Sequence, residues 1–342
     1  MDWLRPFRVR RAFFTGLLHI ALVTIVIGSL VTHYFGEQGE IHLRNDKAVS
    51  LSTKYKTVSL FLWDFRIIYD ADNNPADFIS ELRLIDRSKQ STQIDEGTLS
   101  MNKPLKYHGW RFCQSDYDSD ERGVVLTYNY DPWGTGITYT GYALLLVAMI
   151  GFFCQKNTYF RSLLRKQHTW LMVGLGVFVV VMAVVMTKVV TPKPPLQPVL
   201  QTPLLGIHVS VIMLAYTLFA VILVNGITAL CMPQRREQLM QLSQVLLYPA
   251  LFCLTTGIFI GAVWANMSWG RYWGWDPKET WALITMLVYA LLVHLPFIQA
   301  KCGRLKKKGP IVFHVYAIVA FLFVLFTYFG VSYLLGGLHS YN

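Results

Sequence analysis

Long apolar runs constrain this chain more than any other feature. Seven runs of roughly the twenty residues that a helix needs to cross a bilayer lie near 12–32, 137–154, 169–187, 205–231, 245–264, 279–299 and 311–335. Hydrophobic residues make up 54% of the 342, and the mean hydropathy is +0.38, both too high for a soluble protein of this length. We therefore expect a polytopic α-helical membrane protein with about seven transmembrane helices.

The basic residues behind the net charge of +11 are sorted by the side of the membrane, so the charge does not indicate a nucleic-acid partner. Basic residues gather before the first run, between the second and third, after the fourth and after the sixth; they are Arg5, Arg8, Arg10, Arg11, Lys156, Arg161, Arg165, Lys166, Arg235, Arg236, Lys301, Arg304, Lys306, Lys307 and Lys308. The positive-inside rule makes these segments cytoplasmic. We expect the N-terminus inside, and the C-terminus and the connector between the fifth and sixth runs outside. No A-x-A-like cleavage site follows the first run, so we expect it to be retained as a span.

A polar section, about 33–135, separates the first two runs. Four of its segments alternate as strands do, at 60–69, 78–85, 110–114 and 124–130. Turn sequences separate them, namely Asp72-Asn73-Asn74-Pro75 and Asp118-Ser119-Asp120-Glu121. The pattern predicts a small external antiparallel β domain.

Half of the ten tryptophans fall between the fifth and sixth runs, in a stretch that reads W-A-N-M-S-W-G-R-Y-W-G-W-D-P-K-E-T-W over 264–281. They are Trp264, Trp269, Trp273, Trp275 and Trp281. We interpret the stretch as a connector that meets water between two helices. Its tryptophans are either an aromatic belt at the membrane interface or a platform for a planar ligand, and the residues alone leave both readings open.

The exit from this stretch carries the signature of a helix start. Asp276 is placed as an N-cap, Pro277 as the first helical residue, and Glu279 as the third. This spacing is typical of a capping box, so a helix is expected to begin here with a defined entry angle.

Histidines suggest what the planar ligand is. His208 and His339 are both placed at the external surface, beside the tryptophan stretch. His19 and His294 lie within spans, each roughly 10–12 Å from the cytoplasmic surface at about 1.5 Å per residue. Neutral imidazoles are axial ligands of haem iron, and ionisable residues inside spans tend to be paired or functional. His314 is also near the inner side and competes with His19 as the partner of His294.

Other catalytic signatures are absent from the sequence. It contains no C-x-x-C, C-x-x-C-H, G-x-S-x-G or H-E-x-x-H and no phosphate-binding glycine loop. A c-type cytochrome, a dithiol oxidoreductase, a serine hydrolase, a zinc protease and a nucleotide hydrolase therefore lack their usual parts.

Several segments resemble a known family. Residues 269–284 read W-G-R-Y-W-G-W-D-P-K-E-T-W-A-L-I and resemble the WWD signature of the haem-handling proteins of cytochrome c maturation. Two others resemble the flanking segments of the CcsA branch, L-Q-T-P-L-L-G-I-H-V and F-G-V-S-Y-L-L-G-G-L-H-S-Y. Two more are similar to the CcsB (ResB) partner, M-N-K-P-L-K-Y-H-G-W-R-F-C-Q-S-D-Y and D-P-W-G-T-G-I-T-Y-T-G-Y. The chain thus resembles a compact CcsB–CcsA fusion, the System II cytochrome c synthase.

The resemblance implies a division at about residue 155. Residues 1–155 would be the CcsB-like part, with spans 12–32 and 137–154 around the external domain 33–135. Residues 156–342 would be the CcsA-like part, with five spans and the external WWD loop 264–281. One departure from the family is clear, because the CcsB-like part has one span before a much reduced external domain.

The resemblance also implies roles for individual residues. His208 and His339 would ligate an external haem iron, and His19 and His294 a transmembrane one. The five tryptophans would form the haem platform. Asp276 and Arg271 would meet haem propionates or order the loop.

The implied activity is that of a holocytochrome c synthase in the bacterial cytoplasmic (inner) membrane. It would move non-covalent haem b outward and attach it by thioether bonds to C-x-x-C-H motifs of apocytochrome c. Its partners would be apocytochrome c, the lipid bilayer and possible thiol-reducing accessory proteins, with no nucleic acid. Two other functions stay open, a haem exporter or chaperone serving a separate ligase, and a quinol-oxidising b-type cytochrome.

Overall fold

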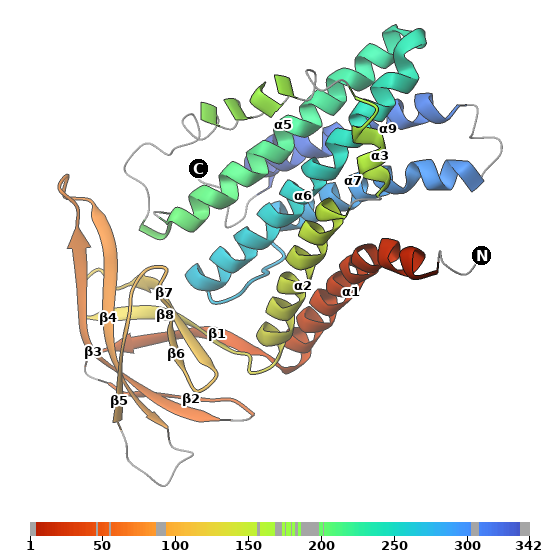
Figure 1. The fold of residues 1–342 in the computed structure, drawn as a ribbon. Coiled ribbons are helices and arrows are strands. Elements are labelled where there is room, and N and C mark those ends of the chain that lie inside the picture. The colour runs from red at the N-terminus through yellow and green to blue at the C-terminus, as the bar shows by residue number, and fades with distance from the viewer. Residues whose placement is uncertain are drawn as a thin grey trace.

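A computed structural model describes residues 5–45, 47–54, 56–86, 94–155, 158–167, 198–200, 202–301 and 308–335, with a few positions between 173 and 185. This part of the chain contains six helices that are long and apolar enough to cross a membrane. The expected span near 169–187 lies largely outside the described residues. The structure confirms a polytopic helical membrane protein with an antiparallel β domain after its first span (Figure 1).

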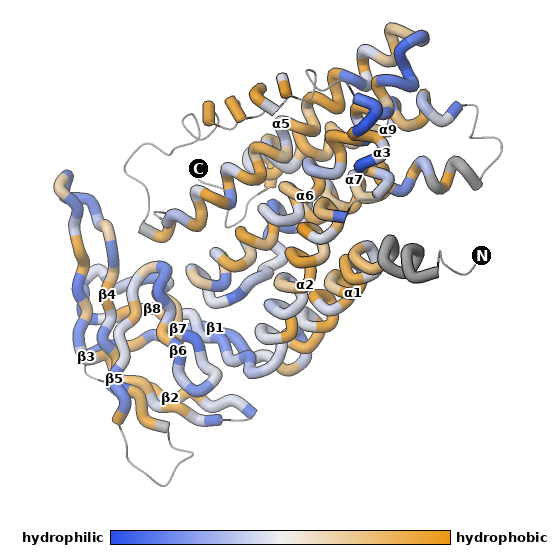
Figure 2. The backbone as a smooth tube through the Cα atoms, viewed as in Figure 1, coloured by the Kyte–Doolittle hydropathy of each residue, from blue (hydrophilic) through white to orange (hydrophobic). Residues whose placement is uncertain are grey.

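The helices follow the apolar runs closely. They are α1 (Arg5–Phe35), α2 (Gly134–Cys154), α3 (Tyr159–Leu164), α5 (Pro203–Cys231), α6 (Arg236–Ser268), α7 (Pro277–Lys301), α9 (Gly309–Leu325) and α10 (Val331–Leu334). Short 3₁₀ turns η2 (Pro198–Leu200) and η3 (Pro233–Arg235) precede α5 and α6, and a π-helical turn, η4 (Phe326–Gly330), joins α9 to α10. Hydrophobic residues colour most of these helices in Figure 2, as lipid contact requires.

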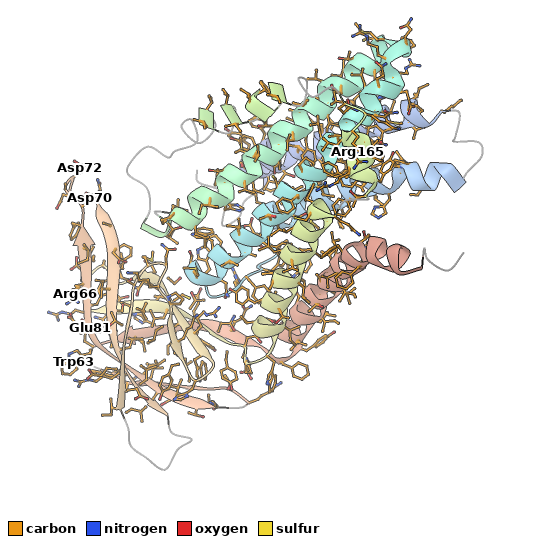
Figure 3. The ribbon with its side chains drawn as sticks, viewed as in Figure 1. Trp63, Arg66, Asp70, Asp72, Glu81 and Arg165 are labelled. Atoms are coloured by element: carbon orange, nitrogen blue, oxygen red, sulfur yellow. The ribbon has the colours of Figure 1, made fainter. Side chains whose placement is uncertain are left out.

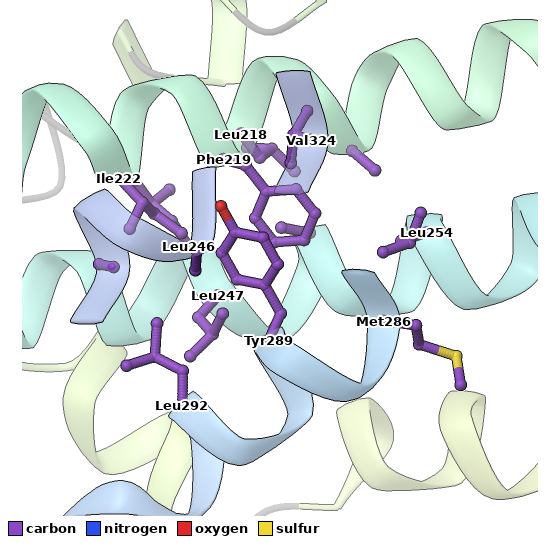
Figure 4. Close-up of a cluster of buried hydrophobic side chains, with 14 of the residues drawn as sticks. Leu218, Phe219, Ile222, Leu246, Leu247, Leu254, Met286, Tyr289, Leu292 and Val324 are labelled. Atoms are coloured by element: carbon purple, nitrogen blue, oxygen red, sulfur yellow. The ribbon is translucent and has the colours of Figure 1, made fainter. Parts of the chain in front are cut away.

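Helices α5, α6, α7 and α9 form a bundle around one apolar core. At its centre the rings of Phe219 and Tyr289 stack with centroids 3.6 Å apart and planes at 17° (Figure 4). Leu246, Leu247 and Leu254 of α6 complete the cluster, all with no more than 3% of their surface exposed. This core fixes α6 and α7, which carry the two ends of the tryptophan stretch.

Helices α1 and α2 form a separate pair that packs very closely. A Cβ placed on Gly28 of α1 would lie 2.7 Å from the backbone nitrogen of Thr138 in α2, and one on Gly141 would lie 2.6 Å from Cγ1 of Ile25. Small residues at a crossing allow helix backbones to approach in a membrane. The pair then meets α6 through apolar contacts with Phe252 and Phe259, rings of α6.

The β domain consists of two four-stranded antiparallel sheets with strand orders β1-β8-β7-β6 and β2-β3-β4-β5. The strands are β1 (Glu37–Arg44), β2 (Val49–Ser52), β3 (Thr57–Tyr69), β4 (Pro75–Asp86), β5 (Ile94–Leu99), β6 (Leu105–Tyr107), β7 (Trp110–Tyr117) and β8 (Gly123–Tyr130). Leu60, Leu82, Phe112 and Leu126 meet between the sheets, each at most 1% exposed. The four predicted strands are confirmed, whereas β1, β2, β5 and β6 were not predicted.

The hairpin β3–β4 turns a charged face to water (Figure 3). Arg66 donates to Glu81 across the hairpin, and the Arg83 guanidinium lies 3.5 Å from the centroid of the Trp63 ring. At the tip, Asp70 accepts from the backbone nitrogens of residues 72 and 74, as the predicted turn requires. This face is therefore solvent-facing, and β7 of the opposite sheet is the strand that contacts α6.

The close packing of α1 on α2 generates a first prediction. Gly28→Leu should lower the stability by about 1–3 kcal/mol or more, because the added side chain overlaps the backbone of α2. Gly16→Leu, on the same helix with nothing within 4 Å of its Cβ position, is the matched control. Thermal unfolding in detergent measures both, and equal midpoints for the two variants would contradict the packing described.

Candidate functional site

The connector between α6 and α7 is shorter than the sequence predicts. Helix α6 continues to Ser268 and α7 begins at Pro277, so the connector is residues 269–276. The expected loop 264–281 is therefore wrong in its bounds. Trp264 lies in α6 and Trp281 lies in α7. Tryptophan has an intermediate helix propensity, so packing of the apolar helix faces can keep both residues helical.

The tryptophan rings lie edge to face and not in one plane. Trp264 is 2% exposed and meets Trp269 at 4.8 Å between centroids and 70° between planes. Trp273 and Trp275 are 5.9 Å apart at 90°, and Trp281 packs 4.2 Å from a phenylalanine ring of the π turn. Trp275 is 70% exposed, so it is the tryptophan of this stretch that solvent reaches most.

The capping box at the start of α7 is confirmed. Oδ1 of Asp276 accepts a hydrogen bond from the backbone nitrogen of Lys278 at 2.9 Å. Oε2 of Glu279 accepts from the backbone nitrogens of Asp276 and Gly274, at 3.3 and 2.8 Å. Both carboxylates are therefore occupied in shaping the connector, and Asp276 is only 6% exposed.

Arg271 is the cation of the connector. Its guanidinium lies over the backbone of Gly274, where a Cβ would be 3.2 Å from Nε. Among the described residues, no carboxylate lies within ion-pair distance of it. The side chain is partly exposed, so its charge is available to an anion at the connector surface.

Polar contacts fasten the connector to the β domain. The side-chain amide of Asn129 in β8 donates to the carbonyl of Gly270 at 2.8 Å. Arg111 in β7 donates to Asn266, and Ser268 donates to Asn102. We refer to these three pairs as the polar clamp. Each joins residues more than 140 positions apart, so the clamp holds the β domain against the connector.

A hydroxyl relay ties the connector to α1 and α2 as well. Thr138 donates to the Tyr272 hydroxyl at 3.1 Å, and Thr32 donates to Asp131 at 2.7 Å. Since the Thr32 proton is engaged by Asp131, the Tyr272 hydroxyl donates its own proton to Thr32. Burial raises the pKa of Tyr272, which keeps the hydroxyl protonated as this relay requires.

The structure brings His19 and His294 together. Their ring centroids are 6.4 Å apart, although the residues belong to the first and sixth expected spans. His19 lies sixteen residues before the end of α1, and His294 lies seventeen after the start of α7, so their depths match. Nδ1 of His19 is bonded to the Thr15 carbonyl at 2.7 Å, and Nδ1 of His294 to the Ala290 carbonyl at 2.8 Å.

His314 does not join this pair. It is fully buried in α9, and its Nε2 is bonded to the carbonyl of Arg236 at the start of α6, 3.0 Å away. Of the two candidates for the neighbour of His294, His19 is thus the one that the structure places beside it.

His208 lies near the start of α5, close to the end of α6 that leads to the connector. Its Nδ1 is bonded to the carbonyl of Gly257 in α6 at 2.7 Å. It is five residues into α5, whereas His294 is seventeen into α7, which separates the two levels by roughly 18 Å along the helices. His339 lies outside the described residues.

Several residues around the connector carried no signal in the sequence. Asn129, Arg111 and Tyr272 are ordinary polar residues, and their partners are remote in the chain. One signal was present, the spacing G-I-F-I-G that begins at Gly257 and brings α5 close to α6. Small residues four apart are typical of close crossings in membranes.

Models of two known protein families match this chain. A family model described as cytochrome C assembly protein matches residues 137–339, more than half of the chain. The chain belongs to the cytochrome c assembly protein family. A second model, described as ResB-like family, matches residues 11–161. This family member therefore carries a ResB-like part and a CcsA-like part in one polypeptide, as the sequence predicted.

The relatives of this family member include several proteins named cytochrome c biogenesis protein CcsA, and a protein named NrfI. Protein NrfI of Wolinella succinogenes is 41% identical over 157 residues, which is 43% of this chain and 17% of NrfI. The cytochrome c biogenesis protein CcsA of Chlamydomonas reinhardtii is 38% identical over 159 residues, 43% of each chain. CcsA of Gloeobacter violaceus is 44% identical over 115 residues, 34% of this chain and 32% of that protein. The chain thus covers less than half the length of each of these relatives.

A cysteine beneath the connector offers a test of the polar clamp. Cys113 in β7 is 2% exposed, and a Cβ on Gly270 would lie 3.2 Å from its sulfur. Burial raises the pKa of Cys113 to about 12, although Arg111 opposes the shift. Because the thiolate is the reactive form, maleimide at pH 7 should modify the exposed Cys231 and leave Cys113 unmodified.

Weakening the clamp should change this result. In the Asn129→Ala variant, we expect Cys113 to react several-fold faster, because the connector is no longer held over β7 and β8. Mass spectrometry of the detergent-solubilised protein gives both rates. If Cys113 reacts as fast as Cys231 without any substitution, the connector does not cover it.

Proposed function

We propose that this protein is a holocytochrome c synthase, which binds haem within the membrane, passes it to the external face and attaches it to apocytochrome c. The observation that carries the proposal is the pairing of His19 with His294 at one depth, 6.4 Å apart. Two imidazoles that share one metal ion have centroids roughly 6 Å apart, since each metal–nitrogen bond is about 2 Å long. The geometry therefore fits a haem iron between α1 and α7.

The hydrogen bonds of this pair favour ligation. Each ring uses Nδ1 toward a carbonyl four residues earlier in its own helix. A donating Nδ1–H leaves the lone pair on Nε2, and such second contacts orient the histidine ligands of metals. His19 and His294 are thus prepared to bind iron through Nε2 without a change of tautomer.

The outer site would be formed by His208, His339 and the connector. His208 has the same kind of orienting bond, here to the Gly257 carbonyl. Arg271 is the better propionate partner than Asp276, because the aspartate is negatively charged and already caps α7. Trp275 offers an exposed ring on which a porphyrin could lie, beside the four less exposed tryptophans.

The reacting groups would belong to the substrates, and this chain would position them. Each cysteine thiol of a C-x-x-C-H motif adds to a haem vinyl group, so one S–C bond forms and the thiol proton ends on the neighbouring vinyl carbon. No electrons are exchanged in this addition, but the thiols must be reduced, which is where thiol-reducing partners would act. The protein's Cys113 is not a nucleophile in this scheme, because it is buried and its pKa is about 12. The protein accelerates the reaction by holding haem and peptide together.

The membrane location follows from the same scheme. Apocytochrome c meets haem at the face that carries the β domain and the connector, which we place outside the bacterial inner membrane. The basic loops at the other end of the helices would then face the cytoplasm, in agreement with the charge distribution.

Histidine substitutions test the inner site. His19→Gly and His294→Gly should each lower the bound haem several-fold, because one axial ligand is lost, and covalent cytochrome should fall in parallel. His33→Gly, also on α1 and with its ring beside that of Tyr34, is the control. Haem is measured by its pyridine complex, and cytochrome formation in a host without another maturation system.

The outcomes of this experiment separate the functions. Normal haem content in the His19 and His294 variants would remove the inner site. Haem binding and export without covalent cytochrome would indicate a chaperone that serves a separate ligase. Reduction of the bound haem by quinol, with no cytochrome formed, would indicate a b-type cytochrome.

The attachment of the protein's own haem can be tested separately. The sequence has no C-x-x-C-H, so haem that co-purifies should be extracted completely by acid–acetone. Haem that remains with the polypeptide after extraction would contradict the view that it is a substrate in transit.

A further inference from the structure

Two glycines one turn apart on α6 face the first turns of α5. A Cβ on Gly257 would lie 2.6 Å from Cδ1 of Ile212, and one on Gly261 would lie 2.6 Å from Cε1 and 2.7 Å from Nδ1 of His208. Ordinary contacts of a Cβ are 3.4–4 Å. The imidazole of His208 therefore occupies the space that any other residue at position 261 would fill.

The backbone of α6 also holds the ring by a hydrogen bond. Nδ1 of His208 lies 2.7 Å from the carbonyl oxygen of Gly257, which has a second lone pair beyond the one used in the helix. The carbonyl is an acceptor only, so Nδ1 carries the proton and Nε2 carries the lone pair. The imidazole of His208 therefore packs directly against the backbone of α6 at Gly257 and Gly261, and it is fixed in one tautomer.

We propose that Gly261 is a positioning residue for His208. It sets the distance of the ring from α6, so that the Gly257 carbonyl can orient it and Nε2 points to the external iron. This inference rests on the proposed function, in which His208 ligates haem. Gly261 lies behind the ligand, and it contacts neither haem nor the reacting atoms.

The size of the effect follows from the distances. An alanine at 261 forces the ring to move by roughly 0.8 Å to reach an ordinary contact, which is the difference between 3.4 and 2.6 Å. Metal–ligand distances tolerate about 0.2 Å. The displaced ring therefore either loses the iron or loses its hydrogen bond to the Gly257 carbonyl.

The test is the Gly261→Ala variant of the full-length protein, purified with its haem. We expect the visible spectrum of the external haem to shift toward that of His208→Gly, with a changed reduction potential and at least several-fold less covalent cytochrome. Added imidazole should restore the spectrum partly, because it supplies the missing ligand. A purely structural defect would lower the yield of folded protein without this imidazole response.

Two glycines of α5 supply matched controls. Gly206→Ala adds a methyl group where nothing lies within 4 Å, and Gly226→Ala adds one 3.1 Å from Ile318, at a packed crossing far from His208. Both should retain the spectrum and the potential of the unaltered protein. Gly226→Ala shows how much a crowded glycine on this helix lowers stability alone.

A double substitution keeps the test decisive if Gly261→Ala folds poorly. In the His208→Gly background the ring is gone, so Gly261→Ala should have no further effect on stability or haem content, and the two changes should be strongly non-additive. Additive losses would overturn the proposal, as would a Gly261→Ala protein with an unaltered spectrum and potential. If His208→Gly itself leaves the spectrum and synthesis unchanged, the ligand assignment has failed instead, and with it the basis of this inference.

Discussion

The hydroxyl group of Tyr272 is the contact on which the arrangement of the molecule depends. It accepts from Thr138 of α2 and donates to Thr32 of α1, and it belongs to the connector between α6 and α7. The α1–α2 pair otherwise meets the bundle mainly through rings of α6. A buried hydroxyl that lost these partners would leave unpaired polar groups, each destabilising by about 1–3 kcal/mol. The relay therefore couples the relative positions of both helical parts to the shape of the connector.

This coupling affects the inner pair of histidines and the outer histidine differently. His19 is contributed by the helix pair and His294 by the bundle, so their distance depends on how the two parts sit against each other. His208 lies roughly 18 Å nearer the connector, within the bundle alone. A shift of the helix pair would thus alter the inner pair while leaving the seat of His208 on α6 intact. The inner histidines are sensitive to the interface between the two parts, and the outer one is not.

The sequence predicts what is local and misses what is not. Spans follow from apolar length, and the cap at Asp276 follows from three neighbouring residues. Four strands have no clear pattern in the sequence because they are short or polar, as β2 and β6 show, and they depend on their partners in the sheet. The convergence of His19 and His294 was visible because depth in a membrane can be counted along the chain.

The polar clamp and the hydroxyl relay could not be predicted by counting residues along the chain. Thr32 and Tyr272 are 240 residues apart, and nothing in either residue type announces the other. The density of tryptophans also predicts a connector of residues 264–281, which is longer than the 269–276 of the structure. In the structure the helices continue through Trp264 and Trp281, since burial of an apolar face determines where they end.

The polar clamp has a consequence for a chain that joins both parts covalently. Its partners are divided by the α2–α3 junction, with Arg111 and Asn129 before it and Asn266 and Gly270 after it. Within one polypeptide, each side meets the other at an effective concentration set by the linking segment, on the order of millimolar for a short tether. A few hydrogen bonds suffice at that concentration. If the chain were cut after Gln155, the same contacts would have to hold two independent molecules, and dilution in the membrane would then decide whether the connector keeps its shape.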